Sequence, residues 1–385
     1  MKFKFLLLYT VSIFLLSSVT AIAQDSVYFY DFSGTKRTPI EQAPIASIIT
    51  QEDTGWLKLD YYTYSKKLKQ RGRYKDREFE IENGAFKSYH ANELIATSGY
   101  YKNGIRQGLF ETYYPNGMMA DSSYYINGIL VGNSISWYPD GTTKKLVQLD
   151  TLANTTGIVV GYFPNGNVSY KGRLARGIRK IGIWNYYHEN GNKASILKYP
   201  RLDESILNQA PSLKYDTLEN MSYDSLVEYT SAICFDESGI EQKGCEIKNY
   251  TSQYKTGPHK WIRYLEDRMQ SIADTRKDDP NTLIYACYVS IGTDGKINDI
   301  LLSNKVNKQI DNEVRNIFLK SKEWIPAMHN NRKLPFMFIQ GIIIIPPEAN
   351  KNLENVERKR VMYQTIETKT SNGLPIGGVL KHDHE

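Results

Sequence analysis

The residues with the most evident chemical potential in this sequence are its three cysteines. Cys234 and Cys245 lie close together, whereas Cys287 lies inside an apolar, strand-like run. In an oxidising compartment the first two cysteines can form a disulfide, and the text FDESGIEQKG between them is typical of a hairpin with a turn near Ser238-Gly239. Two unrelated reduced cysteines are the alternative interpretation. Cys287 is expected to be a small buried apolar residue.

Motifs for catalysis or metal binding are not found in the sequence. It has no nucleophile elbow, His-Glu-x-x-His motif, phosphate-binding loop or Cys/His metal spacing, and its six histidines are scattered. The run GTDGKIND lacks the alternating oxygen ligands and terminal glutamate of a calcium loop. His382 and His384 are interpreted as solvated residues of a polar terminus. We therefore expect no enzyme activity, no cofactor and no metal; a hydrolase with a site assembled from several repeats is the alternative.

The first residues predict export. Lys2 and Lys4 precede an apolar stretch, and Ala21-Ile22-Ala23 before Gln24 is typical of a cleavage site. Residues 1–23 are therefore predicted to be a signal peptide, which places the protein in the periplasm or cell envelope; an uncleaved membrane anchor is the alternative. The formal net charge is +6 and the charges are interspersed, so neither nucleic acid nor an anionic surface is indicated as a partner.

Tyrosine is unusually frequent in this chain, with 29 copies, and a repeated phrase explains part of that excess. TYYPNG, SWYPDG, GYFPNG and YYHENG recur every 24 or 25 residues, and a weaker copy precedes them at 84–93. A fixed period of this length indicates a stacked repeat. Asn116-Gly117 and its equivalents predict two-residue type I′ turns between short antiparallel strands. The unit at 145–166 lacks its first turn, which puts sheet continuity there in doubt, and TGWLKLDYYTYS from Thr54 is interpreted as a sixth, decayed unit.

Alternation along these strands predicts two aromatic rows on opposite faces. The row taken as the inner one would hold the sheet together. The row taken as the outer one is either further cement or a surface that binds a glycan or peptide. The inner row is Tyr89, Tyr113, Trp137, Tyr162 and Tyr187; the outer row is His90, Tyr114, Tyr138, Phe163 and His188, the last four being partner-binding candidates.

These phrases resemble bacterial MORN-type repeats, including the variant labelled antitoxin-like. YYKNGIRQGLFETYYPNG, YINGILVGNSISWYPDG and ARGIRKIGIWNYYHENG carry the resemblance, which covers about 84–200. The resemblance implies an elongated sheet of β-hairpins. The region 24–83 is predicted to be β structure that includes the decayed repeat, and 201–250 is predicted to be a linker containing the cysteine hairpin.

From about residue 251 the pattern changes to helix, hairpin, helix and strand. Apolar residues at helical spacing occupy 259–272 and 310–318, two strands flank Asp294-Gly295, and 334–345 is a final strand. The predicted fold is thus mainly β plus α+β: a repeat sheet followed by a small α+β domain over 251–347. The polar tail 348–385 is predicted to be disordered.

The second domain resembles the C-terminal domain of TonB-type energy transducers. Cys287–Ile297, with its Asp-Gly turn, and Trp324-Ile325-Pro326-Ala327 carry the resemblance, although Arg315 stands two rather than three residues after Glu313. The family implies that the last strand offers a sheet edge to an envelope or outer-membrane protein. The residues near that edge are Phe336, Phe338, Gln340 and Ile342.

The combined prediction is an exported, non-enzymatic binding or scaffold protein of the cell envelope. Its β-repeat surface and its TonB-like edge strand would contact partner proteins, and no membrane span would remain after signal cleavage. The alternative is a membrane-anchored TonB-type energy transducer for outer-membrane transport.

Overall fold

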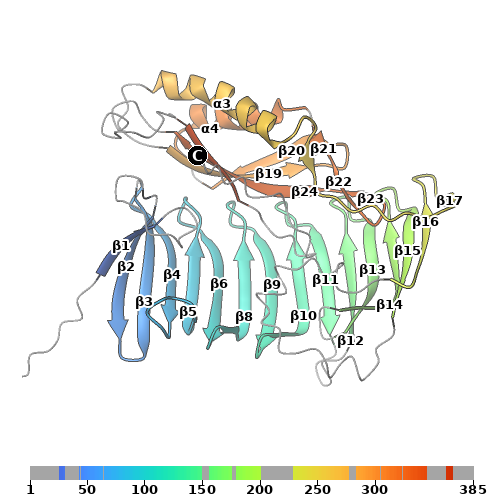
Figure 1. Cartoon of the computed structure of the whole chain (residues 1–385), viewed down its shortest axis with the longest axis horizontal. Helices are drawn as coiled ribbons and strands as arrows, with labels where there is room; N and C mark the ends of the chain where they lie inside the picture. Colours follow the sequence, from blue (N-terminus) through green and yellow to red (C-terminus); the bar gives the residue numbers. More distant parts are fainter. Residues whose placement is uncertain are drawn as a thin grey trace, which may run out of the picture.

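The protein has two layers (Figure 1). A long sheet of upright strands forms one layer, and a smaller part with two helices rests across one end of those strands. The computed structural model describes residues 26–30, 43, 45–63, 65–149, 156–175, 179–200, 229–276, 283–303, 305–322, 324–344 and 361–366. No helix of these residues is long and apolar enough to cross a bilayer, and the predicted signal segment lies outside them.

Within the described part of the chain, the first layer is a 17-stranded sheet. Each strand pairs antiparallel with the next strand along the chain, with one exception. The short β7 pairs with β6 but not with β8, and β8 pairs instead with β6 and β9. The strands are β1 (Ser26–Tyr30), β2 (Ile45–Glu52), β3 (Gly55–Tyr62), β4 (Leu68–Tyr74), β5 (Gly84–Tyr89), β6 (Ile95–Lys102), β7 (Ile105–Arg106), β8 (Gly108–Tyr113), β9 (Met119–Ile126), β10 (Ile129–Trp137), β11 (Thr143–Leu149), β12 (Thr156–Tyr162), β13 (Val168–Ala175), β14 (Arg179–Tyr187), β15 (Lys193–Tyr199), β16 (Ser231–Phe235) and β17 (Glu241–Gln242).

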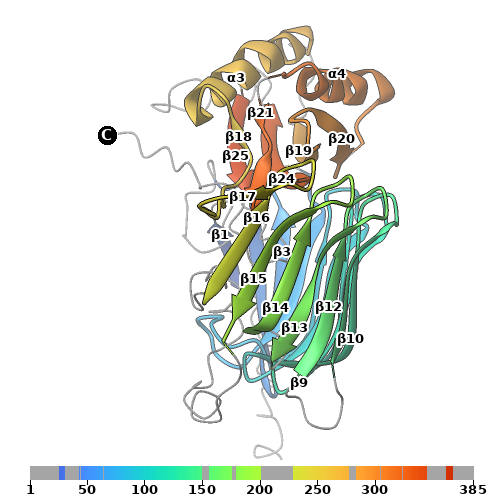
Figure 2. The same cartoon turned by 90° about the vertical axis from the view of Figure 1, so that its right-hand side faces the viewer.

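The sheet has two unlike faces. Figure 2 shows it curving, with the middle strands at the right and both ends bending back to the left. We call the face that carries buried Phe110, Tyr125 and Trp184 the inner face, and the opposite face, which carries exposed Leu109 and Tyr124, the outer face. The sequence predicts this alternation, but its assignment of the two faces is reversed. Tyr113, predicted for the inner row, alternates with buried Phe110 and is only partly buried on the side of exposed Leu109.

The sheet runs further in both directions than the repeat phrases indicate. The decayed unit forms β3, which is paired along its length with β2 and β4. The sheet is also continuous through the repeat at 145–166, which lacks its first turn. Lys145 to Leu149 on β11 pair there with Gly161 to Gly157 on β12. Part of the predicted linker also belongs to the sheet, because β16 pairs with β15. Phe235 to Gly239 thus form a further turn of the array.

The turns at the two ends of the strands differ, and one prediction about them is wrong. Asn103-Gly104 and Asn127-Gly128 have positive φ at both positions, as a type I′ turn requires. In the turns at the opposite ends of the strands, the glycine has positive φ but the residue before it does not, as at Gly117 with φ 84°. There the amide of Gly117 donates to the carbonyl of Tyr114, which closes a four-residue turn instead. Proline at the second position and an Asn side chain that accepts from the amide two residues on both favour this longer turn.

The second part is an α+β unit with the predicted order of elements. Its four-stranded sheet has the order β20-β19-β24-β25. Its elements are β18 (Gln253–Tyr254), α3 (Pro258–Thr275), β19 (Leu283–Ile291), β20 (Ile297–Leu302), α4 (Lys308–Leu319), β21 (Trp324–Ile325), β22 (Ala327–His329), β23 (Arg332–Leu334), β24 (Phe336–Ile344) and β25 (Val361–Ile366). The short pairs β18–β21 and β22–β23 and the strand β25 were not predicted.

The core of this unit lies between the helices and one face of its sheet. Trp261, Leu265 and Met269 of α3 pack with Val314 and Phe318 of α4 against inward residues of the strands. Cys287 is one of these strand residues and is a free, buried cysteine, as predicted. Burial raises the pKa of its thiol, so the group is a neutral packing residue.

Candidate functional site: a hairpin docked on the aromatic face of the repeats

The inner face of the repeat sheet is lined by rings in contact. Tyr101, Phe110 and Tyr125 follow one another edge to face, with ring centroids 5.2 and 5.5 Å apart. Further along, Tyr170 and Trp184 stack with centroids 6.1 Å apart. Glycines on neighbouring strands make room for these rings: a Cβ added to Gly99 would lie 2.3 Å from the Phe110 ring. The aromatic residues therefore hold neighbouring strands together through ring contacts.

A second structural ladder runs along the turns, and it contains four residues of the row that the sequence predicts to face outward. The hydroxyl of Tyr114 donates to the carbonyl of Trp137, and that of Tyr138 donates to the carbonyl of Tyr162. His188 makes the equivalent bond to the carbonyl of Phe235. Tyr114, Phe163 and His188 are buried and Tyr138 is partly buried.

These four residues therefore do not form an exposed binding surface, and the cement interpretation holds for them. The asparagines of the same turns continue the ladder. Asn116 Nδ2 donates to the carbonyl of Pro139, and Asn190 Nδ2 donates to that of Glu237. The reason for the error is tertiary: the row is covered by the C-terminal unit, which sequence alternation does not indicate.

His90 shows how that unit meets the turn ladder. Its Nε2 lies 2.8 Å from the carbonyl oxygen of Tyr113, so this nitrogen carries the proton. Its Nδ1 then accepts from the hydroxyl of Tyr288 on β19 at 3.2 Å. Burial lowers the pKa of His90, with the Tyr113 carbonyl acting in the opposite direction. The neutral ring thus joins the two units through both of its nitrogens.

The β22–β23 hairpin makes the deepest contact between the units. Arg332 is 1% exposed although it carries a charge. Its guanidinium lies 5.4 Å from the ring centroid of Tyr170 and 4.7 Å from that of Tyr186, both on the inner face. Its Nε donates to Ser169 Oγ at 3.2 Å, and one terminal nitrogen donates to the carbonyl of His329 at 3.0 Å. Aromatic faces and oxygen acceptors thus replace the water around the cation.

The turn of the same hairpin contacts the next strands of the array. Asn330 and Asn331 both have positive φ, the left-handed conformation that asparagine adopts more readily than most residues. The hydroxyl of Ser195 on β15 donates to the carbonyl of Asn330 at 3.0 Å. His329 packs edge to face on Tyr186, with centroids 6.0 Å apart. The hairpin therefore occupies the inner face over β13 to β15.

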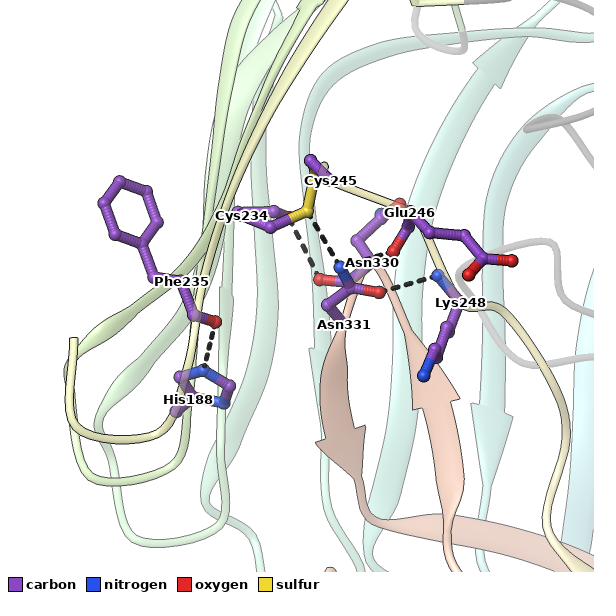
Figure 3. The surroundings of a disulfide bond; sticks show 9 residues. His188, Cys234, Phe235, Cys245, Glu246, Lys248, Asn330 and Asn331 are labelled. Atoms are coloured by element: carbon purple, nitrogen blue, oxygen red, sulfur yellow. Dashed lines mark hydrogen bonds between the residues drawn. A yellow bond between two sulfur atoms is a disulfide. The ribbon is translucent and has the colours of Figure 1, made fainter. Parts of the chain in front are cut away.

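The predicted disulfide stands at this junction (Figure 3). Cys234 on β16 is joined to Cys245, with Cα atoms 5.2 Å apart. Asn331 donates to the carbonyl of Glu246 at 2.8 Å and contacts Cys234 Sγ, while its Oδ1 accepts from the amide of Lys248 at 2.6 Å. The disulfide thus fixes the segment after Cys245 to the last full strands of the array, where that segment binds the hairpin turn.

The predicted partner edge of the C-terminal unit is not a free edge over most of its length. β24 lies between β19 and β25, and β25 pairs with Ile339 to Ile344. Phe336, Phe338, Gln340 and Ile342 are all buried, and Gln340 Oε1 accepts from Trp261 Nε1 at 3.0 Å in the core. The prediction failed because Val361–Ile366, in a tail expected to be disordered, supplies the missing strand.

Arg332, Ser169 and Ser195 were missed as functional residues by the sequence reasoning. The available signal was a single arginine directly after Asn330-Asn331, a left-handed dipeptide typical of a tight hairpin. Its partners lie more than a hundred residues earlier, so no local pattern connects them.

The architecture defines a class: a meander of β-hairpin repeats with a short α+β unit folded onto it. A family model described as a MORN repeat variant matches residues 106–127, which run from β7 to the turn after β9. No curated protein matches the chain. MORN repeats indicate a binding or scaffold role. The TonB-type resemblance of 251–347 gains no support from these comparisons.

Proposed function

We propose that this chain is an exported, non-enzymatic binding or scaffold protein of the cell envelope. The observation that carries the proposal is the unequal use of the two sheet faces. The inner face is lined by packed rings and carries the docked β22–β23 hairpin over β13 to β15. Large apolar residues such as Tyr100, Tyr124 and Ile233, in contrast, stay exposed on the outer face. An exposed apolar surface of this extent is typical of a surface that binds something.

Two features support export and a non-catalytic role. The Cys234–Cys245 disulfide is a bond that persists in oxidising compartments, in agreement with the signal-like residues 1–23. Groups that often serve catalysis have structural roles in this chain: His90 and His188 bind backbone carbonyls of neighbouring turns, and Cys287 is packed in the core.

In this proposal a partner contacts the outer face of the repeat sheet and not the edge of β24. The pairing of β24 with β25 removes the backbone groups that strand addition would need over Ile339–Ile344. A partner is therefore expected to bind side chains of the array and not the edge of the C-terminal unit.

The first test of the proposal is N-terminal sequencing of the native protein with photo-crosslinking in intact cells. A mature chain that begins at Gln24, together with envelope components captured by a crosslinker at Tyr124, supports the proposal. A chain that keeps residues 1–23 points to the anchored transducer instead. A crosslinker at Lys320, on the C-terminal unit, is the matched control, since this position is exposed but lies outside the array.

A further inference from the structure

The outer face gathers charges that are far apart in the sequence. Register pairs place Arg71 on β4 directly opposite Lys87 on β5. Further along the array, Val160 on β12 lies opposite Lys171 on β13. Between these pairs the same row passes first through Ser98, Glu111 and Ser122. It then passes through Ile135, Leu146 and Val160, which lie directly opposite one another. Two basic regions thus lie on one continuous face, separated by a polar stretch and an apolar stretch.

The cations of this face far exceed the carboxylates. Glu52 is bound to Arg73 at 2.7 Å. Glu111 lies opposite Ser98 and Ser122, on the row between the two basic regions. The exposed cations on β4 to β15 include Arg71, Lys87, Lys102, Lys171, Arg173 and Lys198. Repeats of 24 or 25 residues bring such side chains onto one face, although the linear sequence shows no basic run.

Exposed flat and branched side chains stand beside these cations. Leu109 lies directly opposite Tyr124, and Tyr100 lies on the neighbouring strand β6. These three side chains are 46–49% exposed. Aromatic side chains of this kind present an apolar ring face with a polar tip, which suits a ligand that is itself a ring with polar substituents.

We propose that the outer face binds an anionic polysaccharide that lies across the strands. Neighbouring strands are about 4.8 Å apart, roughly the length of one sugar unit in an extended chain, so successive sugars meet successive strands. Tyrosine rings would stack on sugar faces, and the two basic regions would pair with acidic substituents. This inference rests on the proposed binding role and names the ligand class for it.

Other polymers fit the face less well. A nucleic acid carries a charge on every nucleotide and favours a continuous basic stripe, whereas Ile135, Leu146 and Val160 interrupt the cations. An extended acidic peptide gains affinity from backbone hydrogen bonds, and those of the sheet are already used between neighbouring strands. A polysaccharide needs neither a continuous basic stripe nor free backbone groups, because ring stacking and side-chain contacts suffice to bind it.

The test is a binding measurement with the full mature chain and polygalacturonate, a carboxylated polysaccharide, at low salt. Dextran, polyglutamate, single-stranded DNA and anionic phospholipid vesicles serve as comparison ligands. The triple variant Lys87→Gln/Lys171→Gln/Arg173→Gln should bind polygalacturonate on the order of 100-fold more weakly. A control triple, Lys305→Gln/Lys308→Gln/Lys320→Gln, has the same net charge as the first triple. It should bind polygalacturonate within about twofold of the parent chain.

A second variant pair separates stacking from charge. Tyr100→Ser/Tyr124→Ser should weaken polygalacturonate binding about tenfold, while Tyr100→Phe/Tyr124→Phe should retain it. No binding of polygalacturonate overturns the proposal, as does equal or tighter binding of polyglutamate, DNA or vesicles. Unchanged binding in the serine variant overturns it too. If envelope proteins are still crosslinked at Tyr124 when polygalacturonate does not bind, this inference fails and the binding role stands.

Discussion

Arg332 provides the sharpest test of how the two units are joined. Its replacement by alanine removes two hydrogen bonds from a charged donor, to Ser169 and to the His329 carbonyl, worth roughly 1.5 kcal/mol each. It also removes a desolvated cation from the rings of Tyr170 and Tyr186, worth roughly 2 kcal/mol. Relief from burying a charge offsets part of this sum, which leaves a net loss of roughly 3 kcal/mol.

Amide hydrogen exchange of the β22–β23 hairpin measures this loss locally. A loss of roughly 3 kcal/mol should speed exchange at the hairpin amides on the order of 100-fold in Arg332→Ala. One reporter is the Asn330 amide, which donates to Asn249 Oδ1 at 2.8 Å.

The neighbouring Lys333 is the matched control. Its exposed ion pair with Glu237, at 2.9 Å, should contribute less than about 1 kcal/mol, so Lys333→Ala should leave hairpin exchange nearly unchanged. Hairpin exchange in Arg332→Ala that stays within about threefold of the parent chain would refute the reasoning.

Three further predictions concern single positions. Asp140 has no side-chain donor for the next turn, whereas the equivalent Asn116 donates to the carbonyl of Pro139. Asp140→Asn should therefore raise the free energy of unfolding by about 1 kcal/mol in denaturant titrations. No gain in stability would contradict the hydrogen-bond ladder along the turns. Glu93 has φ 69°, so Glu93→Gly should stabilise the chain by about 1 kcal/mol whereas Glu93→Ala should not, and equal effects would exclude backbone strain. Because burial lowers the pKa of His90, the unfolded chain binds the proton more readily, and stability should fall as pH drops below about 6.5. His90→Phe should lose less stability between pH 7.5 and 5, and an equal loss would contradict this assignment.

Local chemistry made much of the fold predictable. Turn glycines at a fixed period, alternation along the strands and helical spacing after residue 258 each depend on neighbours within a few residues. The Cys234–Cys245 bond also belongs to this class, because both cysteines flank one hairpin. The α+β order of the second unit followed from the same local signals.

The errors share one physical cause, which is contact between segments far apart in the chain. Tyr114 and its equivalents looked exposed because nothing near them in the sequence covers them. The β24 edge looked free because β25 follows only after a polar stretch. The type I′ assignment at Asn116-Gly117 failed for a different, local reason, since the preceding proline and the asparagine side chain favour a four-residue turn.

Carbene footprinting of the native protein tests most directly whether the inner face is covered and the outer face is free. Tyr186 is 1% exposed and Tyr124 is 46% exposed, although both are tyrosines of the same sheet. The structure predicts strong labelling of Tyr124, Leu109 and Tyr100 and almost none of Tyr186 and Trp184. Labelling of Tyr186 as strong as that of Tyr124 would contradict the docking of the C-terminal unit on the repeats.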